Sequence, residues 1–141
     1  MINLKAEIQE IIDRETKAWD TQDVELLLSI FHPDMVWPWP PTSYDHDPLN
    51  WIMVLGKFDH QRWNHFYQLF FKEHKLVHNR RETLKIEISE EGDGALAVVD
   101  IDTLWVDTEG QENLWLGRVC KVYAKVSEDW KITMHTGVLR Y

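Results

Sequence analysis

Apolar residues follow helical spacing over the first part of the chain. In the first segment they share one face, opposite a face of charged residues: Leu4, Ile8, Ile11, Ile12, Ala18 and Trp19. This pattern predicts a helix that ends near Asp20. A second, short helix is predicted over residues 24–31, because Asp23 is a good N-cap and Pro33 prevents the helix from continuing.

A third helix is predicted after a brief strand over residues 35–39. Aromatic residues return to helical spacing over residues 63–71, and Asp59 precedes them as a candidate N-cap. The apolar face of this third helix is therefore strongly aromatic.

From residue 77 onward, apolar and polar residues alternate as they do in half-buried strands. Turn-forming sequences at residues 90–94, 107–110 and 127–129 divide this region into four strands joined by hairpins. Early helices and late antiparallel strands indicate an α+β fold with the helices on one face of a meander sheet. Because no linker or repeat interrupts the chain, we expect a single domain over residues 1–141.

Three stretches of the sequence resemble a known family. They are ETKAWDTQDVELLLSIFHPDMVW, with its paired helices, LGKFDHQRW, in which Gly56 leads into the third helix, and the closing hairpin RVCKVYAKVSEDWKITMH. In these stretches the chain resembles the nuclear-transport-factor-2-like (NTF2-like) superfamily, which includes SnoaL-like polyketide cyclases and ketosteroid isomerases. The resemblance implies a cone-shaped fold, in which three amino-terminal helices pack on a strongly curved antiparallel meander sheet.

The resemblance also implies a pocket between the helices and the sheet. Members of the superfamily use this pocket to isomerise, cyclise, dehydrate or hydrolyse small, mostly apolar molecules, or only to bind them, and many form homodimers through the sheet. We therefore expect a small-molecule ligand and a homodimer. The specific isomerase activity is not carried over, because the catalytic aspartate and the tyrosine–aspartic acid oxyanion hole of ketosteroid isomerases have no residue-by-residue match here.

Composition narrows the class of partner and the cell compartment. A net charge of -9 without a basic cluster argues against binding to nucleic acid. No apolar run is as long as a membrane span, and Glu7 and Glu10 lie where a signal peptide would be apolar, so we expect a cytoplasmic protein without membrane attachment. Cys120 is the only cysteine, which excludes an internal disulfide and a thiolate-based zinc site.

The segment HPDMVWPWPP brings two tryptophans close to the expected mouth of the cone. Its prolines suit an edge strand and exclude a central one. Trp37 and Trp39 alternate along that strand, so we expect one ring in the core and the other against a ligand. The alternative is that both rings only seal the core. Tyr44, in the loop that follows, is expected to border the opening.

Strand alternation predicts which polar residues face the pocket. Leu84, Ile86 and Ile88 share one face, and this phase, continued backward, places Glu82, Arg80 and His78 on the inner face. In the next-to-last strand, Arg118 has the same phase as several apolar residues and is expected to be a buried charge. Four carboxylates are candidate partners for it: Glu82, Asp100, Asp102 and Asp34. Arg118 then either forms a structural ion pair or holds a ligand.

Asp34 has two interpretations. It either caps or turns the chain after the second helix, or it acts as an acid or base whose proton affinity is raised beside Trp37. The expected acid/base residues are therefore Asp34, Glu82, Asp100 and His78. The expected ligand-binding residues are Trp37, Trp39, Tyr44, Arg118 and Arg80.

We expect neither a metal nor a cofactor. His74 and His78 have the spacing of two helical ligands, but the pattern changes from helix to strand between them and no third ligand is near. Glycine-rich phosphate loops and a Gly-x-Ser-x-Gly elbow are also missing. His135 alternates with the core residues of its strand. It should be exposed or lie in a subunit interface unless a bulge shifts the phase.

Three classes of function remain open from the sequence. A cofactor-independent acid/base enzyme needs a desolvated acid or base in the pocket, whereas a ligand-binding protein needs only the aromatic wall. A dimeric partner-binding module needs neither, and would show a filled cone and an apolar outer sheet face. For the dimer, we expect the outer face of the last two strands to carry an aromatic and aliphatic stripe of Trp115, Val119, Tyr123, Leu139 and Tyr141.

Overall fold

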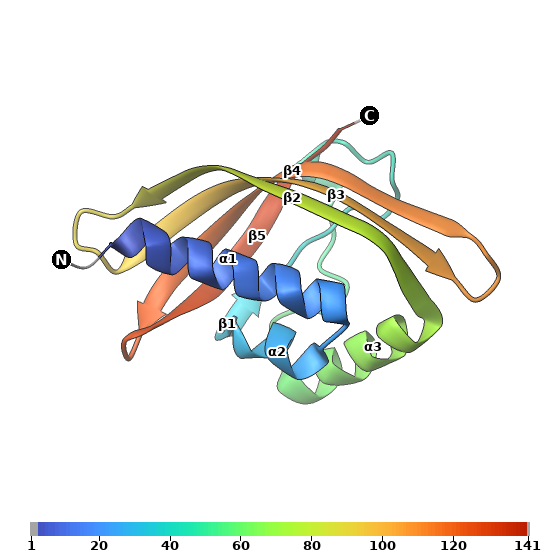
Figure 1. Cartoon of the computed structure of the whole chain (residues 1–141), viewed down its shortest axis with the longest axis horizontal. Coiled ribbons are helices and arrows are strands. Elements are labelled where there is room, and N and C mark those ends of the chain that lie inside the picture. The colour runs from blue at the N-terminus through green and yellow to red at the C-terminus, as the bar shows by residue number, and fades with distance from the viewer. Residues whose placement is uncertain (1–2, 141) are drawn as a thin grey trace.

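A computed structural model of the chain describes residues 3–140. Two helices and a short strand come first, then a third helix, then four long strands (Figure 1). The helices and strands are α1 (Leu4–Thr21), α2 (Val24–Ser29), β1 (Phe31–Val36), α3 (His60–Glu73), β2 (His74–Ile88), β3 (Gly94–Asp107), β4 (Glu112–Val126) and β5 (Asp129–Leu139). A single 3₁₀ turn, η1 (Pro48–Asn50), lies in the long connection before α3.

The helices begin where the sequence supplies a capping side chain. The carboxylate of Asp23 accepts a hydrogen bond from the Leu26 amide at 3.1 Å, and that of Asp59 accepts one from the Arg62 amide at 2.8 Å. Both predicted caps are confirmed. α1 ends where Gln22 adopts a left-handed conformation with a φ of 53°, which terminates the helix as a C-cap does.

The five strands form one sheet in the order β1-β5-β4-β3-β2. β2 to β5 form an antiparallel meander, and β1 adds to β5 in parallel at the edge. The three predicted hairpin turns are confirmed between these strands, two of them with a glycine at positive φ, Gly92 and Gly110. The fold is therefore α+β with a curved sheet, and the helices lie beneath its concave side (Figure 1).

The three predicted helices are present, and as predicted a short strand separates the second helix from the third. β1 and a connection of more than twenty residues separate α2 from α3. The strand predicted over residues 35–39 lies earlier, as β1 (Phe31–Val36), because residues 31 and 36 pair with β5. Trp39 pairs instead with Ile52 of the connection, in an isolated antiparallel bridge.

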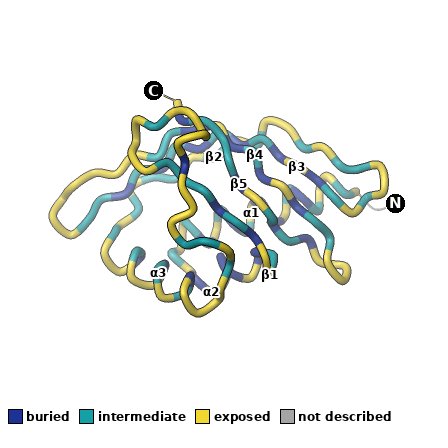
Figure 2. The backbone as a smooth tube through the Cα atoms, turned by 180° about the vertical axis from the view of Figure 1, so that it is seen from behind, coloured by how far each residue is buried: buried dark blue, intermediate teal, exposed yellow. Residues whose placement is uncertain are grey.

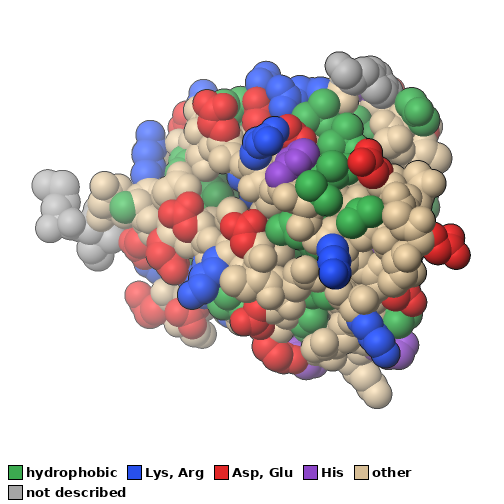
Figure 3. All heavy atoms as spheres, turned by 45° about the vertical axis from the view of Figure 1, so that its right-hand side comes forward, with side chains coloured by type: hydrophobic (Ala, Val, Ile, Leu, Met, Phe, Trp, Pro, Cys, Tyr) green, Lys and Arg blue, Asp and Glu red, His purple; other side chains and the backbone are tan. Residues whose placement is uncertain are grey.

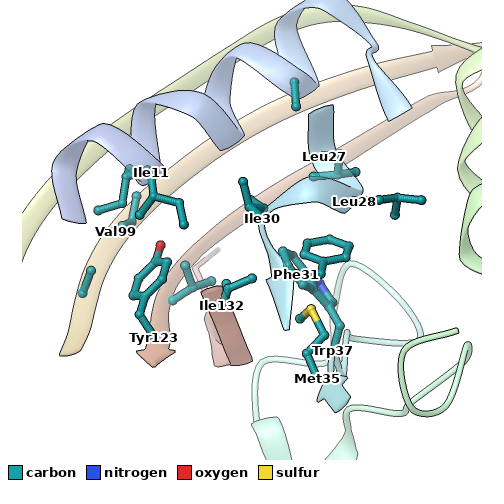
Figure 4. Packing of buried hydrophobic residues seen from close by; sticks show 14 of the residues in the cluster. Ile11, Leu27, Leu28, Ile30, Phe31, Met35, Trp37, Val99, Tyr123 and Ile132 are labelled. Carbon is teal, nitrogen blue, oxygen red and sulfur yellow. The ribbon is translucent and has the colours of Figure 1, made fainter. Parts of the chain in front are cut away.

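The core lies between α1, α2 and the concave face of the sheet. Figure 4 shows Tyr123 and Ile132 extending from the sheet toward Ile11 of α1, with Phe31 and Trp37 packed farther along. Ile11 and Ile132 are completely buried. Burial of such side chains, at about 1.5 to 3 kcal/mol each, supplies the main force that holds the helices on the sheet.

Two of the long strands contain β-bulges that change which side chains face inward. β2 shifts register between Leu76 and His78 and again between Thr83 and Lys85. At the β4–β5 pair, Val122 is opposite Met134 while Tyr123 is opposite Ile132, so Thr133 is the extra residue of a bulge. Buried and exposed positions alternate along the strands in Figure 2, but the alternation reverses across these points.

Among residues 3–140, no helix has both the length and the apolar character needed to cross a membrane.

Candidate functional site

A cavity of about 330 Å³ opens between α3, the sheet and the segment after β1. This volume is at the lower end of the range for small-molecule pockets. Its walls are mainly aromatic, and rings come from both helices and strands: Trp19, Trp37, Trp39, Phe66, Tyr67, Phe70, Trp105 and Trp115. Pro40 and Pro41 stiffen the rim beside Trp39. An apolar ring system is the kind of molecule that such walls bind.

Three charged side chains meet under the wall of this cavity. Both carboxylate oxygens of Glu15 accept hydrogen bonds from Nζ of Lys121, each at 2.9 Å. Nη1 of Arg81 donates to the same carboxylate at 2.7 Å, and the indole nitrogen of Trp19 donates at 3.0 Å. Glu15 and Lys121 are 1% exposed, and the side chain of Arg81 is 10% exposed. Lys121 and Arg81 both line the cavity.

The pKa values of this cluster show how strongly its charges interact. Burial alone would raise the pKa of Glu15, but Lys121 and Arg81 lower it from 4.5 to about 2. Burial lowers the pKa of Lys121 to about 8, although Glu15 opposes the change. At neutral pH the cluster therefore contains one carboxylate and two cations, and it has one positive charge in excess.

The cations are held in place from several directions. Nε of Arg81 donates to the side-chain oxygen of Asn79 at 2.9 Å, and the Thr103 hydroxyl donates to the same oxygen at 2.7 Å. Nζ of Lys121 also lies 5.0 Å from the centre of the Trp37 ring, within the range of a cation–π interaction. The cluster is therefore preorganised, and it joins α1, β2 and β4.

His135 lies on the cavity wall next to this cluster. Its ring is stacked on Trp37, with 4.2 Å between the ring centres and 14° between the planes. The residue is 2% exposed, and neither ring nitrogen has a hydrogen-bond partner among the described residues. Burial, reinforced by Lys121, keeps the pKa of His135 well below its usual value of 6.5, so the ring is neutral at pH 7. A neutral imidazole can donate from one nitrogen and accept at the other.

Tyr67 contributes a buried hydroxyl to the same wall. Burial and the nearby charge of Glu15 raise its pKa above the ordinary value of 10, so it stays protonated. The residues that line the cavity at neutral pH therefore include a neutral histidine with fully buried ring nitrogens, a protonated tyrosine and two cations. These groups can stabilise a negatively charged oxygen and exchange a proton with a bound molecule.

The structure places both tryptophans of the HPDMVWPWPP segment on the cavity wall. The prediction that only one would face a ligand-sized space was wrong, because the strand ends at Val36 and strict alternation ends with it. Trp37 packs on His135, while Trp39 packs on Phe66 of α3, with ring centres 5.5 Å apart.

Asp34 and Tyr44 lie away from the cavity wall. Asp34 is exposed on β1, where its carboxylate is 3.7 Å from Nζ of Lys57. Tyr44 is 81% exposed in the loop beyond the cavity rim. Asp34 is in solvent, so the burial beside Trp37 on which its predicted acid/base role depended is absent.

Glu82, Asp100 and Arg118 lie on the outer face of the sheet, and the predicted inward orientation was wrong. Arg118 donates from Nε and Nη2 to the two oxygens of Asp100, at 2.7 and 3.0 Å, and its side chain is 51% exposed. This hydrogen-bonded pairing with Arg118 lowers the pKa of Asp100. Glu82 is directly opposite Asp100 in the sheet. The expected pairing of Arg118 with Asp100 is therefore present, but on the other side of the sheet.

His78 and Arg80 share this outer face. Both contact Asp102, at 2.9 Å from Nε2 of His78 and 3.5 Å from Nη1 of Arg80. Ile86 and Ile88 face inward. The β-bulge near Lys85 reverses the alternation of side chains along β2, so His78 and Arg80, which come before it, face outward. Among residues 3–140, no group of three or more histidine, cysteine, aspartate or glutamate side chains is arranged to hold a metal ion.

Sequence reasoning missed Glu15, Lys121, Arg81 and His135. Two of them carry a signal that the sequence shows. Glu15 falls on the apolar stripe of α1, one turn from Ile11 and Ile12, and Lys121 lies on the same strand face as Val119 and Tyr123. An acidic residue on the apolar face of one element and a basic residue on the apolar face of another form the pattern of a buried ion pair. His135 and Arg81 carry no such signal, because bulges determine which way they face.

Comparison with known proteins assigns the family. The SnoaL-like domain family matches residues 1–136, and the chain belongs to this family. No curated protein matches the chain.

Solved structures of NTF2-like and ketosteroid isomerase-like proteins have the same fold as this chain. A ketosteroid isomerase-like protein from Erwinia carotovora atroseptica has a TM-score of 0.72 at 12% identity, over 96% of each chain. An NTF2-like protein from Cytophaga hutchinsonii has a TM-score of 0.72 at 16% identity, over 98% of this chain and 100% of that one. An NTF2-like protein of unknown function in nutrient uptake from Rhodospirillum rubrum has a TM-score of 0.68 at 18% identity, over 94% and 98%. At these identities the likeness establishes the fold.

Proposed function

We propose that the chain is a single small-molecule-pocket domain that binds a small, mostly apolar molecule, and that His135 exchanges a proton with that molecule without a cofactor. The observation that carries this proposal is His135 itself: a buried, neutral imidazole with two unpartnered nitrogens on the wall of an aromatic cavity. A buried polar group without a partner is costly in a native protein, by about 1 to 3 kcal/mol. A ligand that supplies the partner removes that cost.

The chemistry that fits these groups is proton abstraction next to a carbonyl. A neutral His135 takes a proton from the carbon, so a C–H bond breaks and an N–H bond forms. The electron pair moves onto the carbonyl oxygen as an enolate, and Lys121 and Arg81 stabilise the new negative charge. Return of a proton from His135 to the carbon completes the exchange. The pocket residues of this chain supply every group that the step needs.

Exchange of hydrogen for deuterium in 2-tetralone tests the proposal. This bicyclic ketone has acidic protons beside its carbonyl, and NMR in D₂O measures their loss directly. We expect the wild-type chain to accelerate exchange at least tenfold over buffer and His135→Phe to abolish the acceleration. Phenylalanine keeps the stacking on Trp37 and removes only the nitrogens. Leu49→Ala, at an 89% exposed position on the neighbouring loop, is the control that should retain full activity.

Tryptophan fluorescence, measured in parallel, reports whether 2-tetralone binds, because several of the cavity rings are indoles. Binding without faster exchange would establish the alternative, a non-catalytic ligand-binding module. Binding of neither 2-tetralone nor naphthalene would refute the pocket proposal.

We also propose that two copies of the chain pair as a homodimer through the outer face of the sheet. The stripe predicted for this role faces inward instead: Val119, Tyr123 and Leu139 are buried, Trp115 lines the cavity, and Tyr141 lies outside the described residues. A different apolar row carries the proposal. Leu96, Val122 and Met134 are opposite one another on three adjacent strands, each about 36 to 38% exposed. On the face drawn in Figure 3, which labels no residue, hydrophobic side chains are interspersed with acidic and basic ones.

A further inference from the structure

The charges around the cavity do not balance. Glu15 provides one negative charge, whereas Lys121 and Arg81 provide two positive ones, and His135 is neutral. A surplus charge in a site that is shielded from water is costly unless a counter-charge compensates it. The surplus is also opposite in sign to the chain, whose net charge is -9.

Arg81 keeps an unused donor nitrogen at the cavity wall, and Lys121 lies beside it with its side chain 1% exposed. Arg81 uses Nε for Asn79 and Nη1 for Glu15, and its Nη2 has no hydrogen-bond partner among residues 3–140. Lys121 directs two hydrogen bonds at Glu15, and an ammonium group has a third. Both side chains line the cavity, and both are at least nine-tenths buried.

We propose that the ligand of this pocket carries an anionic group, most simply a carboxylate, on an apolar framework of one or two rings. The anion pairs with Arg81 and Lys121 and neutralises the surplus charge, while the rings lie among the tryptophans. His135 meets a polar atom on the ring system. This inference rests on the proposed function, because it specifies the class of molecule that the same cavity holds.

The size and the polarity of the cavity agree with this class. About 330 Å³ accommodates a compact aromatic acid better than a large polycyclic molecule. Arginine is the side chain best suited to planar recognition of a carboxylate, because its donors lie in a fixed fork. The aromatic walls make the surroundings of the two cations less polar, which strengthens the charge interaction.

A matched pair of probes tests the inference on the unmodified chain. 2-Naphthoate and 2-naphthamide have nearly the same shape and differ in charge, and quenching of tryptophan fluorescence measures the affinity of each. At pH 7 we expect the carboxylate to bind at least tenfold more tightly than the amide. Equal affinities would overturn the anion inference and leave the pocket proposal intact. Binding of neither probe would overturn both.

Three variants assign the effect to the cluster. Arg81→Gln removes one cation, so the affinity for 2-naphthoate should fall at least tenfold, to the level of the amide. Lys121→Gln removes the other cation, so the affinity for 2-naphthoate should also fall at least fivefold while that for 2-naphthamide is unchanged. Arg118→Gln, on the outer face, is the matched control and should change neither affinity. If Arg81→Gln and Arg118→Gln have the same effect, the preference arises from overall charge and the assignment to this site is wrong.

Discussion

Glu15 is the centre of the buried cluster, so its replacement gives the sharpest test of the structure. Glutamine at this position retains the shape and an acceptor oxygen for Trp19 and Lys121 but removes the negative charge. Lys121 and Arg81 are then buried without a counter-charge, and Lys121, whose pKa burial already lowers to about 8, tends to give up its proton. We expect Glu15→Gln to fold but to be strongly destabilised at pH 7.

The free energy of unfolding that Glu15→Gln loses follows from the pKa of Glu15 and, separately, from the cost of breaking a buried ion pair. Interactions in the folded state lower the pKa of Glu15 from 4.5 to about 2, and at 1.36 kcal/mol per pKa unit this corresponds to about 3 kcal/mol. Removal of one partner from a buried ion pair costs about 3 to 5 kcal/mol in other proteins. Both values are a large fraction of the 5 to 15 kcal/mol that stabilises a typical domain.

Urea denaturation of the wild type and of two variants measures the loss. Glu10→Gln is the matched control, because Glu10 lies on the same helix and pairs with Arg14 at 2.9 Å with its side chain 62% exposed. An exposed pair of this kind contributes less than about 1 kcal/mol. If Glu15→Gln costs no more than Glu10→Gln, the buried cluster does not have the geometry described here.

The same variant predicts a pH dependence with a definite sign. The pKa of Glu15 is lower in the folded state than in the unfolded state, so its contribution to stability is complete above pH 4.5. It is lost as the pH falls from 4.5 toward 2, where the folded state also takes up the proton. The difference in unfolding free energy between wild type and Glu15→Gln should therefore shrink over that range. A difference that stays constant would refute the low pKa.

Further predictions concern the pocket, the dimer and the outer face. The affinity for 2-naphthoate should fall as the pH rises through about 8, where Lys121 loses its proton; a flat fluorescence titration from pH 6 to 9 would contradict this. Besides Lys121, whose proton this prediction concerns, the titratable groups around the buried cluster are Glu15, Arg81, Tyr67, Tyr123 and His135. Val122→Glu should shift sedimentation at micromolar concentration to the monomer, since it places a charge in the centre of the proposed interface; an unchanged dimer would exclude this face. Arg118→Ala should leave the midpoint of thermal unfolding within about one degree of wild type, because the Arg118–Asp100 pair is solvated, and a shift of several degrees would show that the pair is structural.

Local signals in the sequence were sufficient for the secondary structure. A capping carboxylate needs only the amides that follow it in the chain, so Asp23 and Asp59 marked the starts of α2 and α3 correctly. The hairpins were equally local, since glycines such as Gly92 adopt the positive φ that the turn requires. These features depend on a few neighbouring residues, and the α+β class follows from their order.

The direction in which a strand residue faces is not determined by its neighbours in the sequence. The site predictions that depended on this direction were wrong. A single extra residue in a strand reverses every side chain beyond it, and whether a bulge forms depends on pairing with another strand. The bulge at Thr133 turned His135 inward, and a bulge in β2 turned Glu82 outward. In β4 both faces carry apolar residues, so the sequence pattern alone could not choose between Arg118 and Lys121.

The choice between those two residues depends on a partner that lies more than a hundred positions away in the chain. Lys121 can face inward only because Glu15 on α1 accepts two hydrogen bonds from it, and an unpaired lysine there would lose its proton or its place in the core. A buried ion pair of this kind is seldom more stable than well-packed apolar residues of the same size. The gain in stability therefore does not explain why three charges are buried under a sheet with ample apolar material. The proposed anionic ligand accounts for two of them on the wall of an aromatic cavity, with a positive charge in excess and an unpartnered histidine beside them.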